Sequence, residues 1–149
     1  MLSDILTGRY VQRFGDWAPL TLRVALGIIF VWHGYDKLTA VGIPGVAGFL
    51  GSLGIPLPEF MAYILTYGEF IVGGFLILGL FTHVAAKFTT IVAIVAFFTV
   101  HLKNGFAIGN GGYEFIMLIF AASVSLLITG AGAYSLDATW RRKGGGSAM

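Results

Sequence analysis

The sequence contains no cysteine and few charged residues. Lysine, arginine, aspartate and glutamate make up 11% of its 149 residues, whereas a soluble domain has about 25%. Without cysteine, the chain cannot form a disulfide scaffold, a thiol redox relay of its own or a zinc or iron–sulfur site with cysteine ligands. Because 57% of the residues are hydrophobic, too little polar surface is left for a soluble globular enzyme.

Two further classes of function lack support in the sequence. The formal net charge is only +2, which is too small for the basic surface of a nucleic-acid-binding protein. No glycine-rich loop with the spacing of a phosphate-binding motif is present. The composition therefore indicates a protein whose surroundings are lipid.

Four segments are long and apolar enough to cross a bilayer, whose core of about 30 Å needs roughly 20 apolar residues per helix. They are residues 18–38, 60–81, 83–101 and 112–133. These segments predict an all-α fold, a polytopic membrane protein built as a bundle of four transmembrane helices. We expect a single membrane domain over residues 1–143 and a flexible glycine-rich tail over residues 144–149.

The residues before the first span predict a short helix at the membrane surface rather than a cleaved signal peptide, because charges interrupt any long apolar run. The apolar residues at near-helical spacing are Leu2, Ile5, Leu6, Val11, Phe14 and Trp17. Cations favour the same side of the bundle: Arg9 and Arg13 precede the first span, and residues 141–143 follow the last. The positive-inside rule then places both termini in the cytoplasm.

The connection between the first two expected spans, residues 39–59, is unusually apolar. It has no charged residue before Glu59 and is rich in glycine and proline. Its core, residues 46–56, is far too short to cross a bilayer. We therefore expect an interfacial or re-entrant segment that covers the outer mouth of the bundle.

Three charged residues inside the expected spans are candidates for proton handling: Glu69, Arg23 and Glu114. A charge near the bilayer centre costs about 2.5–3.5 kcal/mol on insertion scales, so such groups face the bundle interior and pair. Glu69 lies about 13 Å beyond the start of its span, at about 1.5 Å of rise per residue. A pair between Glu69 and Arg23 is feasible. A structural ion pair and a proton or ligand site are both open interpretations of Glu69.

Helical spacing places Arg23 on a stripe that also carries glycine. The stripe consists of Arg23, Gly27, Phe30, Gly34 and Lys37. In the second span, Glu69 and Gly73 have the same spacing of four residues. Because glycine lets two helices approach closely, we expect the ionisable side chains to lie in the seam between them.

A second group of polar residues is expected at the outer surface. It consists of His33, Asp36, Lys37, His101, Lys103, Tyr113 and Glu114. The spacing of its histidines and carboxylates matches no helical pair of metal ligands, so no metal site is expected. A pocket for the headgroup of a hydrophobic ligand fits these residue types better. Its candidate ligand-binding residues are His33, Lys37, His101 and Tyr113.

Several motifs together resemble the DoxX family. The first half of the family is matched by the stripe from Arg23 to Lys37 and by Phe49-x3-Leu53-Gly54-Ile55-Pro56. The second span is matched by Glu69, Gly73, Gly74, Leu76 and Gly79-Leu80. The remaining matches are Gly111-Gly112-Tyr113-Glu114 and the closing motif Gly130-Ala131-Gly132-Ala133-Tyr134-Ser135-Leu136-Asp137. The resemblance covers nearly the whole chain in the order of the family.

The resemblance implies a small four-helix protein of the bacterial inner membrane. Some members of the family are associated with quinone-coupled thiosulfate oxidation or with oxidative-stress assemblies that include soluble partners. The chain is also similar to the four-helix bundle of quinone-linked thiol oxidoreductases, whose cysteine pairs it lacks.

Three hypotheses of function follow. The first is a membrane subunit of a redox or oxidative-stress complex that binds a quinone, or another isoprenoid or lipid ligand, between its helices. Such a subunit has no covalently bound cofactor and is at most part of a quinone-linked oxidoreductase, taking electrons from a protein partner. The second is a non-catalytic anchor or assembly factor for a partner complex or a homo-oligomer. The third, a small-solute or proton transporter, is disfavoured because four spans leave little room for a pathway and no inverted repeat is visible.

Overall fold

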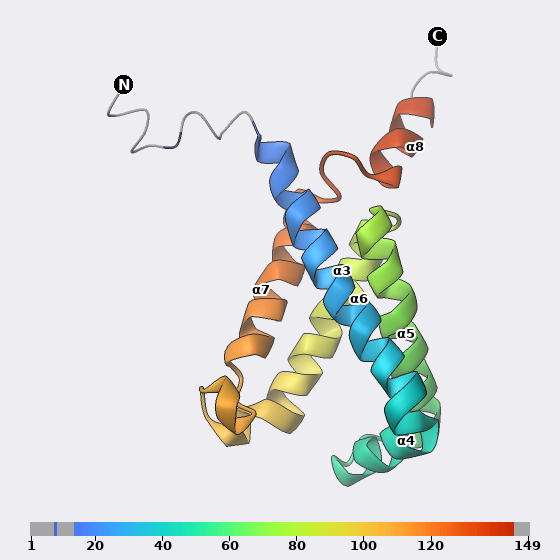
Figure 1. Ribbon diagram of the computed structural model, residues 1–149, viewed down its shortest axis with the longest axis vertical. Helices are drawn as coiled ribbons and strands as arrows, with labels where there is room; N and C mark the ends of the chain where they lie inside the picture. The colour runs from blue at the N-terminus through green and yellow to red at the C-terminus, as the bar shows by residue number, and fades with distance from the viewer. Residues whose placement is uncertain (1–7, 9–13, 145–149) are drawn as a thin grey trace.

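The computed structural model describes residues 8 and 14–144, and this part of the chain contains helices, turns and loops but no strand (Figure 1). The predicted all-α class is confirmed. The elements in chain order are η1 (Gly15–Trp17), α3 (Ala18–Asp36), η2 (Lys37–Val41), α4 (Gly42–Ser52), α5 (Pro58–Leu78), α6 (Thr82–Ala96), η3 (Phe97–His101), η4 (Leu102–Asn104), η5 (Ile108–Asn110), α7 (Glu114–Thr129) and α8 (Leu136–Gly144). The predicted N-terminal surface helix and the tail from residue 145 onward lie outside the described residues, apart from Phe14 and Trp17.

Within the described residues, three helical runs are long and apolar enough to cross a membrane. They are Gly15–Ser52, Pro58–Leu78 and Thr82–Asn104. The fourth expected span, residues 112–133, corresponds to α7, which has only 16 residues and is about 24 Å long. It ends early because Gly130 adopts a φ of 74° and the chain leaves the helix.

The first helical run is longer than the predicted span because the chain does not leave the helix at Leu38. After α3, the π-helical turn η2 leads directly into α4, and Gly42 changes the direction of the chain with a φ of 72°. Helix α4 then lies across the end of α5 (Figure 1). Its buried residues Val46 and Leu50 pack against Ala62 of α5. Much of the apolar segment expected between the first two spans is therefore helical.

The long helices form two pairs. Helix α3 packs along α5 and α6 packs along α7, and the pairs diverge toward the end where α4 lies (Figure 1). The first pair is close because of glycine: a Cβ atom at Gly27 would lie 2.6 Å from the carbonyl oxygen of Gly73. A Cβ atom at Gly34 would lie 2.6 Å from the backbone nitrogen of Phe70. The prediction that these glycines allow close helix packing is confirmed.

The outward faces of the helices carry large apolar side chains. Ile128 is 80% exposed, and Trp32 and Phe98 are each 67% exposed. Soluble proteins rarely expose large contiguous apolar patches. These faces are those of a protein surrounded by lipid.

Candidate functional site

A cavity of about 530 Å³ lies between α3, α4, α5, α6 and α7. Pockets for small molecules usually measure about 300–1,000 Å³ and have mostly apolar walls with a few polar groups. Most of the lining residues here are aliphatic or aromatic, including Phe30, Phe49 and Phe88. The ionisable lining residues are His33, Lys37, Glu69 and His101.

Lys37 and Glu69 form an ion pair in this cavity. The Lys37 Nζ atom lies 2.6 Å from Glu69 Oε2, and the side chains are 20% and 7% exposed. Glu69 comes from the middle of α5, whereas Lys37 begins the π-helical turn η2. The long aliphatic stem of lysine lets its ammonium group reach inward from the end of α3. The predicted pair between Glu69 and Arg23 is wrong, because Lys37 is the counter-ion.

Arg23 binds the protein backbone at the opposite end of the bundle. It is 1% exposed, and each of its nitrogens donates to backbone carbonyl oxygens at 2.5–3.3 Å. The acceptors belong to Leu76, Ile77, Ala131, Ala133 and Tyr134. The first two close the C-terminus of α5, where carbonyl groups lack partners in the helix. Arg23 does not line the cavity, and proton handling by Arg23 stays a prediction that this geometry does not favour.

The closing motif, residues 130–137, lies at the same end as Arg23. The Asp137 carboxylate accepts hydrogen bonds from the backbone N–H groups of Phe81, at 2.8 Å, and Thr82, at 2.9 Å. These groups open α6, so Asp137 satisfies free donors at a helix N-terminus and interacts favourably with its dipole. The closing motif therefore joins three helices at this end of the molecule.

His101 reaches the cavity from α6 through a second π-helical turn, η3. Its Nδ1 atom lies 2.7 Å from the carbonyl oxygen of Gly111, and Asn104 Nδ2 donates to the same oxygen at 3.1 Å. Turns of this type shift side chains from the face they would occupy on a regular helix and often occur at functional sites. Both π-helical turns carry an ionisable cavity residue, Lys37 in η2 and His101 in η3.

Two of the predicted site residues, Tyr113 and Glu114, do not line the cavity. The Tyr113 ring packs against Phe97 and Phe106, with centroids 5.2 and 5.5 Å apart. Glu114 Oε2 accepts a hydrogen bond from Ile108 N at 3.0 Å and so holds the preceding loop. Ligand binding by Tyr113 and proton handling by Glu114 stay predictions. In the described part of the chain, no group of three or more His, Asp or Glu side chains gathers as a metal site.

Sequence reasoning did not identify most of the cavity wall. The missed residues on α6 and η3 include Phe88, Ile91, Val92, Val95 and Thr99. They recur at helical spacing, but the same spacing is found in any buried helix face, so it did not single out a cavity. The Phe49–Pro56 segment was noted for its apolar character, and its Phe49, Leu53 and Pro56 side chains line the cavity.

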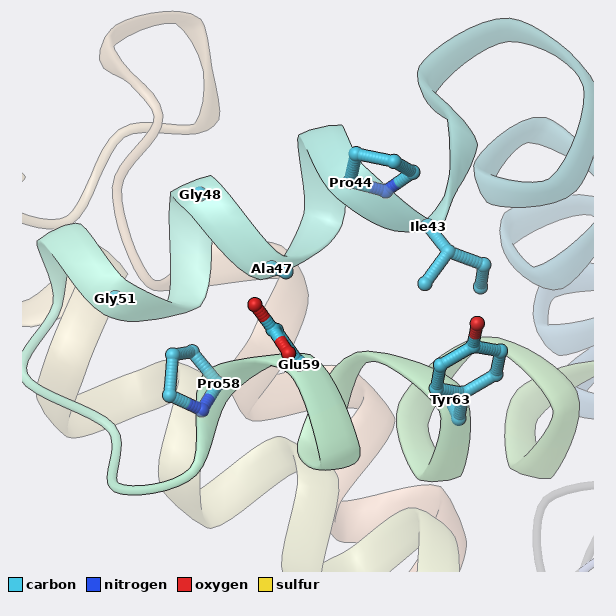
Figure 2. A pocket seen from close by; sticks show the side chains of 8 residues that line it. All are labelled: Ile43, Pro44, Ala47, Gly48, Gly51, Pro58, Glu59 and Tyr63. Atoms are coloured by element: carbon cyan, nitrogen blue, oxygen red, sulfur yellow. The ribbon is translucent and has the colours of Figure 1, made fainter.

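A second hollow of about 510 Å³ lies between α4 and the first turns of α5. Figure 2 shows the Glu59 carboxylate pointing toward α4, between the prolines of the two segments. Glu59 and Tyr63 are exposed there. This hollow is therefore part of the outer surface, and Glu59 is the only Asp, Glu, Lys or Arg among its lining residues.

Together these features define an all-helical membrane protein with a mostly apolar cavity among its helices. The pattern of the DoxX family matches residues 18–102, which is more than half of the chain. The protein therefore belongs to the DoxX family.

Three relatives cover most of the chain. "Putative oxidoreductase CatD" of Bacillus subtilis (strain 168) is 38% identical over 79% of this chain and 83% of its own. "Inner membrane protein YqjF" of Escherichia coli (strain K12) is 29% identical over 89% of this chain and 99% of its own. "Inner membrane protein YphA" of the same organism is 33% identical, with 88% and 97% covered. No solved structure matches the chain.

Proposed function

We propose that this protein is a membrane subunit of a redox or oxidative-stress complex and that its cavity binds a quinone or another isoprenoid or lipid molecule. The observation that carries the proposal is the Lys37–Glu69 pair at 2.6 Å in a mostly apolar cavity of about 530 Å³. An apolar wall with a few convergent polar groups suits a ligand with an apolar body and a small polar head. The name of the relative "Putative oxidoreductase CatD" agrees with a redox role.

The charge of the pair favours an uncharged headgroup. The Lys37 ammonium and the Glu69 carboxylate together carry no net charge. An anionic headgroup such as a phosphate would draw Lys37 away and leave the Glu69 charge buried without a partner, which is costly. A quinone ring has only carbonyl acceptors, and it can take a hydrogen bond from Lys37 while the ion pair stays intact.

The proton chemistry follows from the position of Glu69. Reduction of a quinone consumes protons, and a carboxylate beside the ring can take up a proton and pass it on to the ring. Ionisable groups inside membranes commonly serve as proton relays. The electrons come from a protein partner, because the chain has no cysteine to relay them through thiols.

We place the bundle across a bacterial inner membrane as a single domain with four spans, α7 being the fourth. At about 24 Å, α7 is shorter than the bilayer core, and local thinning of the bilayer accommodates such a mismatch. Helix α4 is the interfacial or re-entrant segment. It lies at the end where the helix pairs diverge (Figure 1), and its Phe49 and Leu50 line the cavity.

The distribution of cations supports an orientation with both termini in the cytoplasm. The start of α3 and helix α8 lie at the same end of the bundle (Figure 1). Residues 141–143 are all cationic and belong to α8, and Lys87 lies in the first turns of α6, whereas Lys103 lies at the opposite end. The positive-inside rule assigns the end with more cations to the cytoplasm.

Quinone binding to purified protein in lipid nanodiscs tests the proposal. We expect a short-chain benzoquinone to bind the unaltered protein, and Glu69→Gln or Lys37→Met to weaken binding by about tenfold or more. Glu59→Gln is the matched control, because Glu59 is on the same helix but outside the cavity. Equal binding by Glu69→Gln and the unaltered protein would contradict the proposal. Native purification that yields a partner complex without any quinone would favour the anchor hypothesis instead.

A further inference from the structure

We infer that the cavity prefers the hydroxyl-bearing, reduced form of its aromatic ligand, a quinol or related phenol, over the carbonyl-bearing quinone, and that His101 sets this preference. The inference rests on the proposed function and specifies the form of the ligand. It concerns binding alone.

The first step is the state of the His101 ring. A carbonyl oxygen only accepts hydrogen bonds, so the 2.7 Å contact between His101 Nδ1 and the carbonyl oxygen of Gly111 requires the proton to be on Nδ1. In the neutral ring, Nε2 then carries a lone pair and acts as an acceptor. Within the described residues Nε2 has no protein partner, so it is the ring nitrogen left for a ligand.

The tautomer is held by more than one contact. Gly111 has a φ of 71°, and its carbonyl oxygen also accepts a hydrogen bond from Asn104 Nδ2 at 3.1 Å. The next residue, Gly112, is buried, and a Cβ atom there would lie 2.3 Å from the carbonyl oxygen of Gly105. The loop that presents the Gly111 carbonyl is therefore tightly packed, and it fixes both the orientation and the tautomer of His101.

The second step is a count of the hydrogen-bond donors and acceptors among the ionisable residues that line the cavity. Lys37 offers only donors, whereas His101 Nε2 and the Glu69 carboxylate offer acceptors. Glu69 uses Oε2 for Lys37, and no other hydrogen bond of this carboxylate occurs in the described structure. His33 is the remaining ionisable lining residue, and no hydrogen bond within the described part of the chain fixes its tautomer. It can therefore serve as donor or acceptor and does not discriminate between the two forms.

The third step compares the two forms of the ligand with this set. The oxygens of a quinone only accept hydrogen bonds, so they can satisfy Lys37 but leave His101 Nε2 and the free Glu69 oxygen without a donor. A hydroxyl group both donates and accepts. It can donate to His101 Nε2 or Glu69 and still accept from Lys37. The hydroxyl-bearing form therefore satisfies both kinds of group, and the quinone satisfies one.

Comparing the affinities of one short-chain benzoquinone and its hydroquinone tests the inference. Titration calorimetry is carried out without oxygen in nanodiscs at pH 8. Because the chain has no cysteine, a mild reductant that keeps the hydroquinone reduced does not alter the protein. We expect the hydroquinone to bind about tenfold more tightly than the quinone, since a mismatched acceptor costs that much.

The variant His101→Phe keeps a ring and removes both nitrogens, so we expect the preference to fall to less than about threefold. His83→Phe is the matched control: His83 lies at the other end of α6 and lines neither hollow. It should keep the preference of the unaltered protein. Nitrogen NMR of histidine-labelled unaltered protein gives a readout that needs no stable variant. It should show His101 protonated at Nδ1, with the Nε2 resonance shifting when hydroquinone is added.

Each outcome has a distinct meaning. Equal or tighter binding of the quinone, a preference kept by His101→Phe, or a proton on Nε2 would overturn the inference while leaving the proposed function standing. If neither form binds, the proposed function fails, and the inference fails with it.

Discussion

The two ends of the bundle differ in what binds their buried charged side chains. At the end with α8, the Arg23 guanidinium is 1% exposed and binds five backbone carbonyl groups. At the end with α4, Lys37 and Glu69 bind one another beside a cavity of about 530 Å³. One charge is bound by backbone that belongs to fixed helix ends and turns. The other two are bound by a single contact between side chains.

The difference indicates which end is built for stability and which can take a ligand. Backbone carbonyls held in helices and turns cannot move away from Arg23 without disrupting these elements, and most of them would lose a donor that nothing else replaces. The Lys37 ammonium has N–H groups that Glu69 does not use, and the neighbouring space is open. We expect changes at the Arg23 end to alter folding, and changes at the Lys37 end to alter both stability and binding.

Removing the guanidinium should give the largest effect. Arg23→Met removes the side-chain donor of five buried or partly buried backbone hydrogen bonds, and we expect a loss of at least about 3 kcal/mol in the free energy of unfolding. Denaturant titration in mild detergent, followed by circular dichroism, measures the loss. The control is Arg142→Met, which removes an exposed arginine of α8 and should change stability little. Equal stability of the two variants would contradict the conclusion that the Arg23 end of the bundle is built for stability.

Breaking the Lys37–Glu69 ion pair should cause the second-largest loss of stability. Lys37→Met leaves the Glu69 carboxylate buried alone, which costs about 3 kcal/mol. Replacing both residues, as Lys37→Met with Glu69→Leu, should recover most of that loss, because an apolar pair can replace a buried ion pair. The double variant should still bind the quinone and the hydroquinone about tenfold or more weakly than the unaltered protein. A double variant with the summed losses of the single variants would show that the residues do not act as a pair.

Adding a side-chain atom where α3 contacts α5 should cause an intermediate loss of stability. Gly34→Ala places a Cβ atom 2.6 Å from the backbone nitrogen of Phe70, and such overpacking costs about 1–3 kcal/mol. Gly74→Ala is the matched control on α5, because nothing lies within 4 Å of its added Cβ atom. Alanine there should be neutral or stabilising by up to about 1 kcal/mol, through helix propensity. Thermal unfolding of both variants compares them, and a destabilised Gly74→Ala would argue against lipid-facing open space at that position.

The smallest effect is expected from removing a hydrogen bond between α6 and α7. The Thr89 hydroxyl donates to Ser123 Oγ at 2.8 Å, and both residues are buried between α6 and α7. Hydrogen bonds between membrane helices contribute about 0.6 kcal/mol on average. Thr89→Val should therefore lower stability by about that amount, as unfolding titrations can resolve. Ser125→Ala, which removes a bond within α7 only, is the control. A loss of several kcal/mol from Thr89→Val would place the main stabilising contact here rather than at Arg23.

Much of the fold follows from composition and helical spacing. The apolar segments predict helices of the observed positions, and the glycine stripe predicts the close packing of α3 on α5. Helix bounds were less predictable: α7 ends at Gly130 because of its backbone conformation, which an apolar window does not detect. Helix α8 was not predicted, since it is short and its last turns are mainly cationic.

The candidate site was predicted in two separate parts that the structure joins. The rise per residue predicts that Glu69 lies in the membrane interior and Lys37 at the outer surface. Arg23 is therefore the cation that the sequence places nearer to Glu69. The long lysine side chain and the π-helical turn η2 defeat an argument based on regular rise alone. Spacing also gave no information on the backbone acceptors of Arg23, because carbonyl groups are present at every position.

The position of these acceptors along the chain has a consequence for how the protein is made. Leu76 and Ile77 follow Arg23 closely enough to be synthesised with the second hydrophobic segment, whereas the other acceptors come after residue 130. While the ribosome is still extending the chain, the first helix therefore holds an arginine that is only partly bonded. Its hydrogen bonds are completed only after residues 131–134 have been synthesised, so we expect a protein truncated before residue 130 to be exposed to membrane quality control.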